Sequence, residues 1–450
     1  MSTGKRSRFD GALRATLWFW PFVAAVVSVV VTILLLMVRP DPGPVWATWL
    51  WPSGVDAATT LLQAVASSIM TATTLIFSLT VVALQLASQQ FSPRLLREFA
   101  RDRVTQVVLA ILVSTFVVSV TGLRGMDADR PLPVLVPAVV LVLGIGSALA
   151  LLFFVGHIVK SLRVDTMMVS VHAEASRTTR QSYPEYADHS KNPRPGLPGP
   201  ERGTLVVSPS SGFIKAVWPE DLVQAAAEHG AFILVGVRPG DHVTVGTPLA
   251  SIWADDGDSA SAEVGELVRE AVIRAVDLGF ERTLEQDAAL GLRQLTDIAV
   301  KAISPSINDP ITAAHAVGYC ADLLVQLQGR KLGPQQHNDE HGTPRVVTPD
   351  RDHRYYLDLV CAPIRRFGCS EPLVLTALLR MLRDCAVNAR DDTHRGNIED
   401  QVDLILESMD EQVLPYDGDA VRDLAARVEL ALGGNVDDAY RDRAGETRSV

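Results

Sequence analysis

Hydrophobic residues are concentrated in the first third of the chain, in four runs at residues 17–38, 59–88, 104–122 and 132–159. None of the four runs contains Asp, Glu, Lys or Arg. An α-helix rises about 1.5 Å per residue and the hydrocarbon core of a bilayer is about 30 Å thick, so about 20 apolar residues suffice for a crossing. The pattern therefore predicts an α-helical transmembrane bundle of four spans, within a domain of residues 1–165.

Basic residues predict how these spans are oriented. They precede the first run at the N-terminus, recur as arginines within residues 94–103 after the second run, and follow the fourth run at Lys160 and Arg163. Because Lys and Arg are retained on the cytoplasmic side, both termini are expected in the cytoplasm. The chain is thus expected to be a multi-pass protein of a bacterial inner (plasma) membrane, with membrane lipid as a partner.

The second run differs from the others because polar residues recur along it at steps of three, four or seven, at Gln63, Ser67, Thr71, Thr74, Ser78 and Gln85. In a helix these positions share one face. Such a face either packs against other helices, with hydroxyls bonding back to their own helix, or lines a water-filled path. Both interpretations stay open, and we identify no ring of charge that would indicate an ion preference.

Behind the bundle, the pattern predicts a cytoplasmic α+β region. Residues 166–203 are expected to form a helix extension and a flexible linker rich in Pro and Gly. Residues 204–253 alternate short β-rich runs with turns around one helical stretch, which predicts a small β barrel or sandwich-like domain. Residues 263–432 have helical periodicity and predict an α-helical domain, with a loop at 331–350. Residues 433–450 are expected to be a disordered tail.

Charge and cysteine content exclude some classes of function. Residues 1–165 hold 13 Lys or Arg against 8 Asp or Glu, and the remainder holds 28 against 44, so the second region is acidic. An acidic soluble region repels phosphate backbones, so nucleic acid is not an expected partner. The four cysteines form no Cys-x-x-Cys pair, and the ligand-type side chains His337, Asp339, Glu340 and His341 are more typical of a solvated loop. No metal site and no cofactor are therefore predicted.

One segment of the helical region contains a dense motif. Pro305 ends one helix, and Asp309 followed by Pro310 is a good start for the next. The motif either builds a tight helix–helix turn with a charge ladder or presents a polar cluster to a ligand or to the membrane domain. Its residues are Arg293, Gln294, Asp297, Ser304, Pro305, Ser306, Asn308, Asp309 and Pro310.

The chain resembles the DUF2254 family of predicted bacterial membrane proteins. The resemblance rests on residues 90–96, His157-Ile158, Ser211-Gly212 and the stretch from Gln286 to Pro310. It implies four spans and a cytoplasmic tail, and it implies no reaction. It adds a set of residues where the chain leaves the membrane, namely Phe91, Ser92, Pro93, Arg94 and His157.

Function is less constrained than fold. The sequence has no Gly-rich phosphate loop, nucleophile elbow or paired metal motif, so an enzyme is disfavoured, including a hydrolase built on Asp297, Asn308 and Asp309. The leading hypothesis is a homo-oligomeric channel-like or transport protein with a cytoplasmic assembly or gating domain. The alternative is a membrane-anchored signalling or scaffolding protein whose helices bind an unidentified cytoplasmic protein partner.

Overall fold

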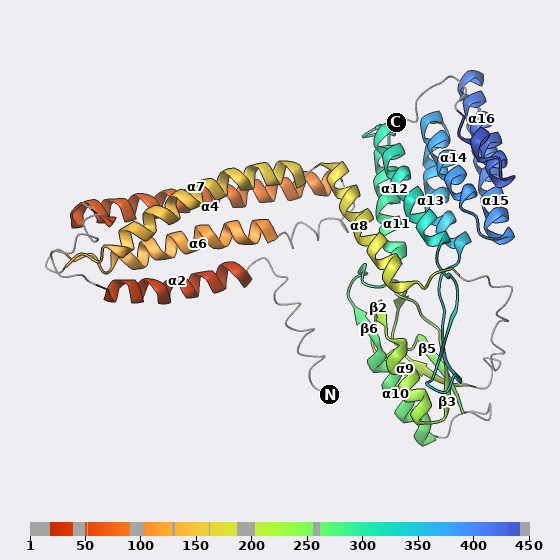
Figure 1. Cartoon of the computed structure of the whole chain (residues 1–450), viewed down its shortest axis with the longest axis horizontal. Coiled ribbons are helices and arrows are strands. Elements are labelled where there is room, and N and C mark those ends of the chain that lie inside the picture. The colour runs from red at the N-terminus through yellow and green to blue at the C-terminus, as the bar shows by residue number, and fades with distance from the viewer. Residues whose placement is uncertain are drawn as a thin grey trace. The chain divides into compact units, whose positions relative to one another are not determined.

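The computed structural model describes residues 19–38, 50–51, 53–90, 103–127, 131–161, 163–186, 203–254 and 262–441, with backbone only at 86–90 and 262. The chain forms two compact units, residues 1–167 (unit 1) and 168–450 (unit 2). Figure 1 shows unit 1 as a bundle of long helices and unit 2 as a group of helices and sheets. Phe91, Ser92, Pro93 and Arg94 lie outside the described residues.

Unit 1 contains four helices that are long and apolar enough to cross a membrane, α2 (Phe19–Met37), α4 (Val55–Gln90), α6 (Arg103–Leu123) and α7 (Leu135–Ser161). They coincide with the four predicted runs, so the prediction of four apolar helices is confirmed. α6 packs against the other three helices. At Gly122, an added Cβ would lie 2.7 Å from Val136 and 3.0 Å from Leu62, so this glycine permits close packing of α6 with its neighbours.

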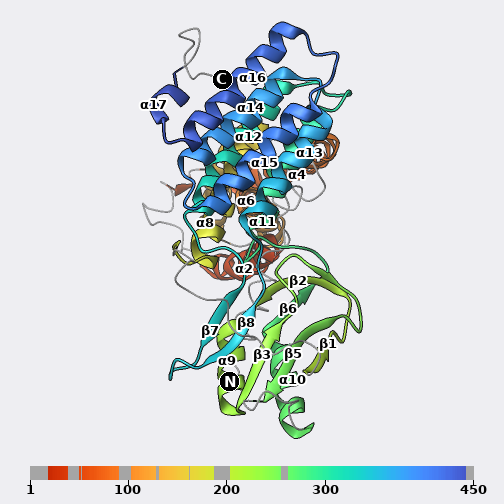
Figure 2. The same ribbon diagram turned by 90° about the vertical axis from the view of Figure 1, so that its right-hand side faces the viewer.

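Six helices of unit 2, α11 to α16, form three antiparallel pairs that stack side by side (Figures 1 and 2). One layer contains α11 (Ala288–Ala302), α13 (His353–Gly368) and α15 (Asp392–Ser408). The other contains α12 (Pro310–Gln328), α14 (Pro372–Val387) and α16 (Pro415–Leu432), each beginning with the proline that favours a first helical position. Each helix contacts its own partner and the adjacent pairs, as in repeat arrays.

Two sheets make up the rest of unit 2 (Figure 2). The larger has the order β1 (Thr204–Val207), β5 (Pro248–Ala254), β3 (Ala231–Val235), β8 (Pro344–Thr348) and β7 (Gln335–Asn338). The smaller has the order β4 (His242–Val243), β2 (Gly212–Val217) and β6 (Val276–Gly279). With α9 (Pro219–Glu228) and α10 (Ala262–Ala275) they share one apolar core that includes Ile214, Ile233, Leu249, Ile252, Val268 and Val272.

The sheets correct two sequence predictions. The barrel is wrong, because the strands pair in two open sheets without closure. The loop at 331–350 is also wrong, because β7 and β8 form a hairpin there and β8 pairs in parallel with β3. The apolar part of β8 is only Val346 and Val347, too short for its pattern to identify a strand. The sheets therefore join residues 204–254 with segments that were assigned to a helical domain.

The expected disordered tail is ordered over its described part. Val436–Ala439 form the short helix α17, and Tyr440 donates a hydrogen bond to Asp384 Oδ1 at 2.6 Å. The Arg383 guanidinium lies 4.1 Å from the centre of the Tyr440 ring. Residues 442–450 lie outside the described residues. The last described residues are thus attached to α14, on the middle helix pair.

Candidate functional site

The polar face of α4 is the first candidate, and it comprises the six predicted residues Gln63, Ser67, Thr71, Thr74, Ser78 and Gln85. All six are exposed in the protomer. The residues of α4 that the bundle buries are Ala58, Leu62, Ala66, Ile69, Ile76 and Ala83. At 3.6 residues per turn, the polar set falls almost opposite the buried set. The bundle of a single protomer therefore leaves this face uncovered.

Hydroxyl and amide groups on the polar face differ in whether they have hydrogen-bond partners. Thr71 Oγ1 donates to the Ser67 carbonyl at 3.1 Å and Thr74 Oγ1 donates to the Met70 carbonyl at 3.0 Å. Within the part of the chain that the structure describes, no hydrogen bond of the Gln63 or Gln85 amide is recorded. An amide without a partner in hydrocarbon is costly, so these two side chains need polar surroundings.

Three buried hydroxyl groups inside the bundle have hydrogen-bond partners. Thr115 on α6 and Ser147 on α7 are both fully buried, and their hydroxyl oxygens lie 2.8 Å apart. Ser119, also buried, donates to the Thr115 carbonyl at 2.8 Å. Packing between helices therefore accounts for these hydroxyls, whereas it does not account for the polar face of α4.

The structure extends the polar face by two residues that the sequence analysis missed, Asp56 and Thr60. Both are exposed, and they continue the helical spacing back from Gln63 toward the start of α4. Thr60 Oγ1 donates to the Asp56 carbonyl at 2.8 Å. The spacing alone could have found both, since Thr60 lies within the predicted span, whereas Asp56 lies before its start at residue 59. One end of the polar face thus carries a carboxylate.

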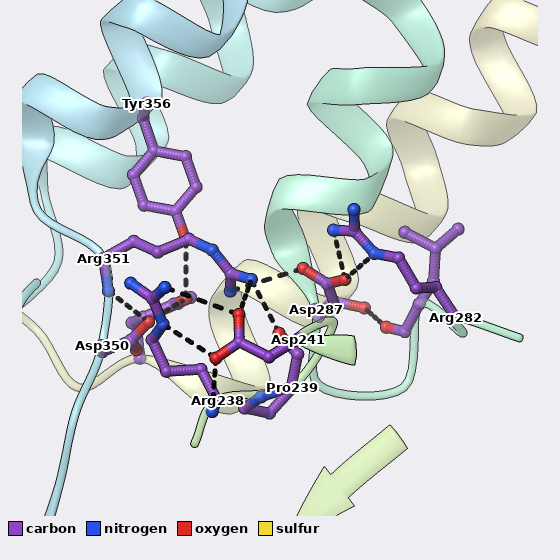
Figure 3. A network of polar contacts seen from close by, with 11 residues as sticks. Arg238, Pro239, Asp241, Arg282, Asp287, Asp350, Arg351 and Tyr356 are labelled. Carbon is purple, nitrogen blue, oxygen red and sulfur yellow. Dashed lines mark hydrogen bonds and ion pairs between the residues drawn. The ribbon is translucent and has the colours of Figure 1, made fainter. Parts of the chain in front are cut away.

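A buried charge network in unit 2 is the second candidate (Figure 3). Its centre is Arg351, which lies between β8 and α13 and is only 4% exposed. The Arg351 guanidinium donates to the Pro239 carbonyl at 2.8 Å. It also lies 3.5 Å from Asp287 Oδ1 and 3.8 Å from Asp241 Oδ1. One arginine thereby connects the turn before β4 with the start of α11.

Asp287 precedes α11 and is held by a second arginine. Arg282 Nε and Nη2 donate to Asp287 Oδ2 at 2.9 and 2.6 Å. Burial raises the pKa of the Asp287 carboxyl, although the charges of Arg351 and Arg282 oppose that shift. Gly240 has a φ of +91°, and a Cβ there would collide with the Asp287 carboxylate, so the close approach requires glycine.

The same network includes the end of α8 (Val164–Ser182), the helix that follows α7. The Tyr183 hydroxyl lies 2.7 Å from the Tyr356 hydroxyl and donates to Asp350 Oδ1 at 3.3 Å. Asp350 Oδ1 also accepts from the Arg351 backbone N–H at 2.6 Å. Burial raises the pKa of the Asp350 carboxyl to about 6. The network therefore ties α8, α11, α13 and the turn before β4 together.

The chemistry of this network supports a structural role. It acts as a joint that holds α8, α11, α13 and the turn before β4 together. Asp241 and Asp287 lie close to Arg351, and Asp287 is also held by Arg282. Among the described residues, no group of three or more His, Cys, Asp or Glu is arranged to hold a metal. In the β7–β8 hairpin, His337 Nε2 lies 3.0 Å from Thr348 Oγ1 and Asp339 accepts from Arg345 at 2.8 Å.

The other predicted residues lie apart from both candidates. Arg293, Gln294 and Asp297 are on α11, and Ser304, Pro305, Ser306, Asn308 and Asp309 form the turn between α11 and α12. Asp309 caps α12 by accepting from the Thr312 N–H at 3.1 Å, and Pro310 is its first residue, so the predicted helix start is confirmed. His157 lies in the last turns of α7, with Nε2 3.3 Å from Ser161 Oγ.

Comparison with known proteins relates the chain to a family of predicted membrane proteins. The family model described as predicted membrane protein (DUF2254) matches residues 14–384. Uncharacterised proteins of Mycobacterium bovis and Mycobacterium tuberculosis are each 33% identical over 398 residues, which cover 88% of this chain and 76% of theirs. No solved structure matches.

Proposed function

The chain belongs to the DUF2254 family of predicted membrane proteins, and on that premise we propose that it is a homo-oligomeric channel-like or transport protein of the bacterial inner membrane. In this proposal the four apolar helices cross the bilayer and both termini are cytoplasmic. Copies of α4 line the path, and unit 2 is the assembly or gating domain. The bound partners are membrane lipid and further copies of the chain.

The observation that carries the proposal is the outward polar face of α4. The interior of unit 1 is filled, since Leu62, Leu112 and Phe154 are fully buried there. A path through a single protomer would have to displace this core. Lipid also satisfies amides poorly. Several copies around an axis, with their α4 faces turned toward one another, would supply the polar groups with water and with one another.

The connection between the units supports a gating role for unit 2. α7 ends at Ser161 and α8 begins at Val164, so only two residues separate the last apolar helix from the helix that enters unit 2. α8 leads directly to Tyr183 in the charge network. In this proposal, a change in that network is passed along α8 and the short segment that joins α8 to α7.

Ion flux through proteoliposomes tests the proposal. Replacing Thr74 and Ser78 by Leu should reduce flux by at least tenfold, because apolar side chains then replace polar ones along the path. Thr73→Val is the matched control. Thr73 Oγ1 also donates to a carbonyl of its own helix, that of Ile69, at 2.8 Å, but Thr73 lies on a partly buried side of α4. Flux should stay near the wild-type value in that control. A monomeric mass for the purified protein in nanodiscs would contradict the proposal.

An anchored scaffolding protein is the alternative, and exposed apolar side chains on the helix pairs favour it. Phe367, Leu414 and Tyr416 are 60%, 66% and 85% exposed. Patches of this kind bind other proteins or membranes. Wild-type liposomes without flux, together with a monomeric mass, would favour this alternative.

A further inference from the structure

The turn between α11 and α12 uses its polar groups internally. Ser304 Oγ donates to the Lys301 carbonyl at 2.7 Å, and the Asn308 and Asp309 N–H groups donate to Ser304 and Ala302 carbonyls at 2.9 and 2.8 Å. The Asp309 carboxylate accepts from both the N–H and the hydroxyl of Thr312. The Ser304 and Asp309 side chains are thus occupied within the turn.

Beside the exposed Ser306 and Asn308, the turn exposes apolar side chains. Ile307, at its tip, is 41% exposed, and Ile311, in the first turn of α12, is 54% exposed. Asn308 has a φ of +50°, the left-handed region that Asn tolerates better than most residues, and this conformation fixes the direction of the chain beside Ile307. A rigid turn therefore holds an isoleucine outward.

A third exposed apolar residue lies close by at the end of α13. Phe367 is 60% exposed. A Cβ on the adjacent Gly368 would lie 3.3 Å from Ile303 Cδ1, which places the end of α13 beside the start of the turn. Lys301 in α11 and Arg366 in α13 add positive charge at this end of the helices. Ile307, Ile311 and Phe367 are called the apolar tip below.

The apolar tip lies at the end of unit 2 where the chain enters it. α8 and α12 run in the same direction, because His172 contacts Asp322 at 2.5 Å and Ser176 donates to Gln326 at 2.6 Å. Following both helices back from these contacts leads to the start of α12 and to Met168, the first residue of unit 2. Ser161, the last residue of α7, precedes Met168 by only seven positions.

We propose that the apolar tip is a membrane-anchoring surface that inserts into the lipid headgroup region. Exposed aliphatic and aromatic side chains with basic neighbours are the composition that binds bilayer interfaces, where basic groups meet anionic headgroups. This end of unit 2 is also the one that the chain enters from α7. The proposal is independent of conduction and assigns a role to the Ser-Pro-Ser-Ile-Asn-Asp-Pro turn.

Fluorescence quenching of full-length protein in liposomes tests this contact. Ile307→Cys, in a Cys369→Ser background, is labelled with an environment-sensitive nitrobenzoxadiazole probe; the other three cysteines are buried. Liposomes contain phosphatidylglycerol and phosphatidylethanolamine, with or without lipid that carries a nitroxide in its acyl chain. Val245→Cys, an equally labelled control, replaces an exposed valine in the sheet region that is 67% exposed.

The proposal predicts at least twofold stronger quenching at Ile307 than at Val245. Adding Ile307→Asp to a protein labelled at Ile311→Cys should weaken the quenching of that second label. Equal quenching at Ile307 and Val245 would overturn the proposal. A blue-shifted probe at Ile307 that lipid nitroxide does not quench would also overturn it, because a second copy of the chain or another protein would then cover the surface.

Discussion

The two units treat polar groups in opposite ways. In unit 2 the groups of the charge network are buried and face one another, as Arg351 and Asp287 do. In unit 1 the polar groups of α4 face outward, and Gln63 has no recorded partner in the described part of the protomer. The fold of unit 2 therefore pairs Arg351 with Asp287, whereas the fold of unit 1 leaves a polar surface on α4.

Solvation explains why this difference is informative. A soluble unit can expose any polar group to water, so burying charges requires arginines and carboxylates in mutual contact. A unit that crosses a bilayer, as we propose for unit 1, has the opposite constraint, since its outward polar groups would meet hydrocarbon. Burial of Arg351 thus indicates a structural joint, and exposure of Gln63 favours function or assembly.

The largest expected effect is on the joint itself. Arg351→Met should lower the free energy of unfolding of unit 2 by about 3–5 kcal/mol, because Asp287 and the Pro239 carbonyl lose a buried partner. Hydrogen exchange of α11 and α13 peptides in the full-length protein measures this. Arg395→Met is the control, because the exposed Arg395–Asp392 pair at 3.4 Å should contribute less than about 1 kcal/mol. Equal effects would show that the network is not a joint.

The second effect is a pH dependence from Asp350. Since burial raises its pKa from 3.8 to about 6, the folded state holds a proton between about pH 4 and 6 that the unfolded chain releases. Its contribution to stability therefore falls as the pH rises through this window. Asp350→Asn should remove that loss. The free energy of unfolding of the variant, taken relative to that of the wild type, should therefore be up to about 3 kcal/mol higher at pH 7 than at pH 4. A parallel pH series of hydrogen exchange for both proteins isolates this carboxyl.

A smaller effect is expected inside unit 1. Thr115→Val removes the buried hydroxyl bond to Ser147 and should lower the free energy of unfolding by about 1 kcal/mol. Unfolding in mixed micelles with increasing dodecyl sulfate measures it. Flux per folded protein should not change. A loss of flux without a loss of stability would place Thr115 on the path. The buried hydroxyls, and not the polar face of α4, would then line it.

The smallest effect on the protomer is predicted for the polar face. Thr74→Val should change the free energy of unfolding by less than about 0.5 kcal/mol in the same micelles, because Thr74 is exposed and contacts no neighbouring helix through its hydroxyl. A loss as large as that of Thr115→Val would mean that the α4 face is packed within the protomer.

Local patterns predicted the helices because their signal is contained in consecutive residues. The four apolar runs and the Asp309-Pro310 helix start are signals of this kind. Helical periodicity also placed Gln63 and Ser78 on one face of α4. Whether that face is turned inward or outward depends on which side of α4 the other helices cover, and no pattern within α4 contains that information.

Long-range pairing explains what the sequence could not predict. β8 lies beside β3, although more than a hundred residues separate Ile233 from its partner Val346. The charge network has the same origin, since Asp241, Asp287 and Arg351 come from distant segments and each is ordinary in its own context. Gln286-Asp287 was included in the family motif, but its arginine partners were not recognised.

The attachment of Tyr440 to Asp384 has a consequence for how the stack of helix pairs comes apart. In a nearest-neighbour stack the terminal pair has only one adjoining pair, so it is the first to fray. α15 and α16 hold that position, and Tyr440 reaches past them to α14. Residues 436–440 thus tie the terminal pair to α14, and a chain shortened at Asn435 would lose this contact and open from that side.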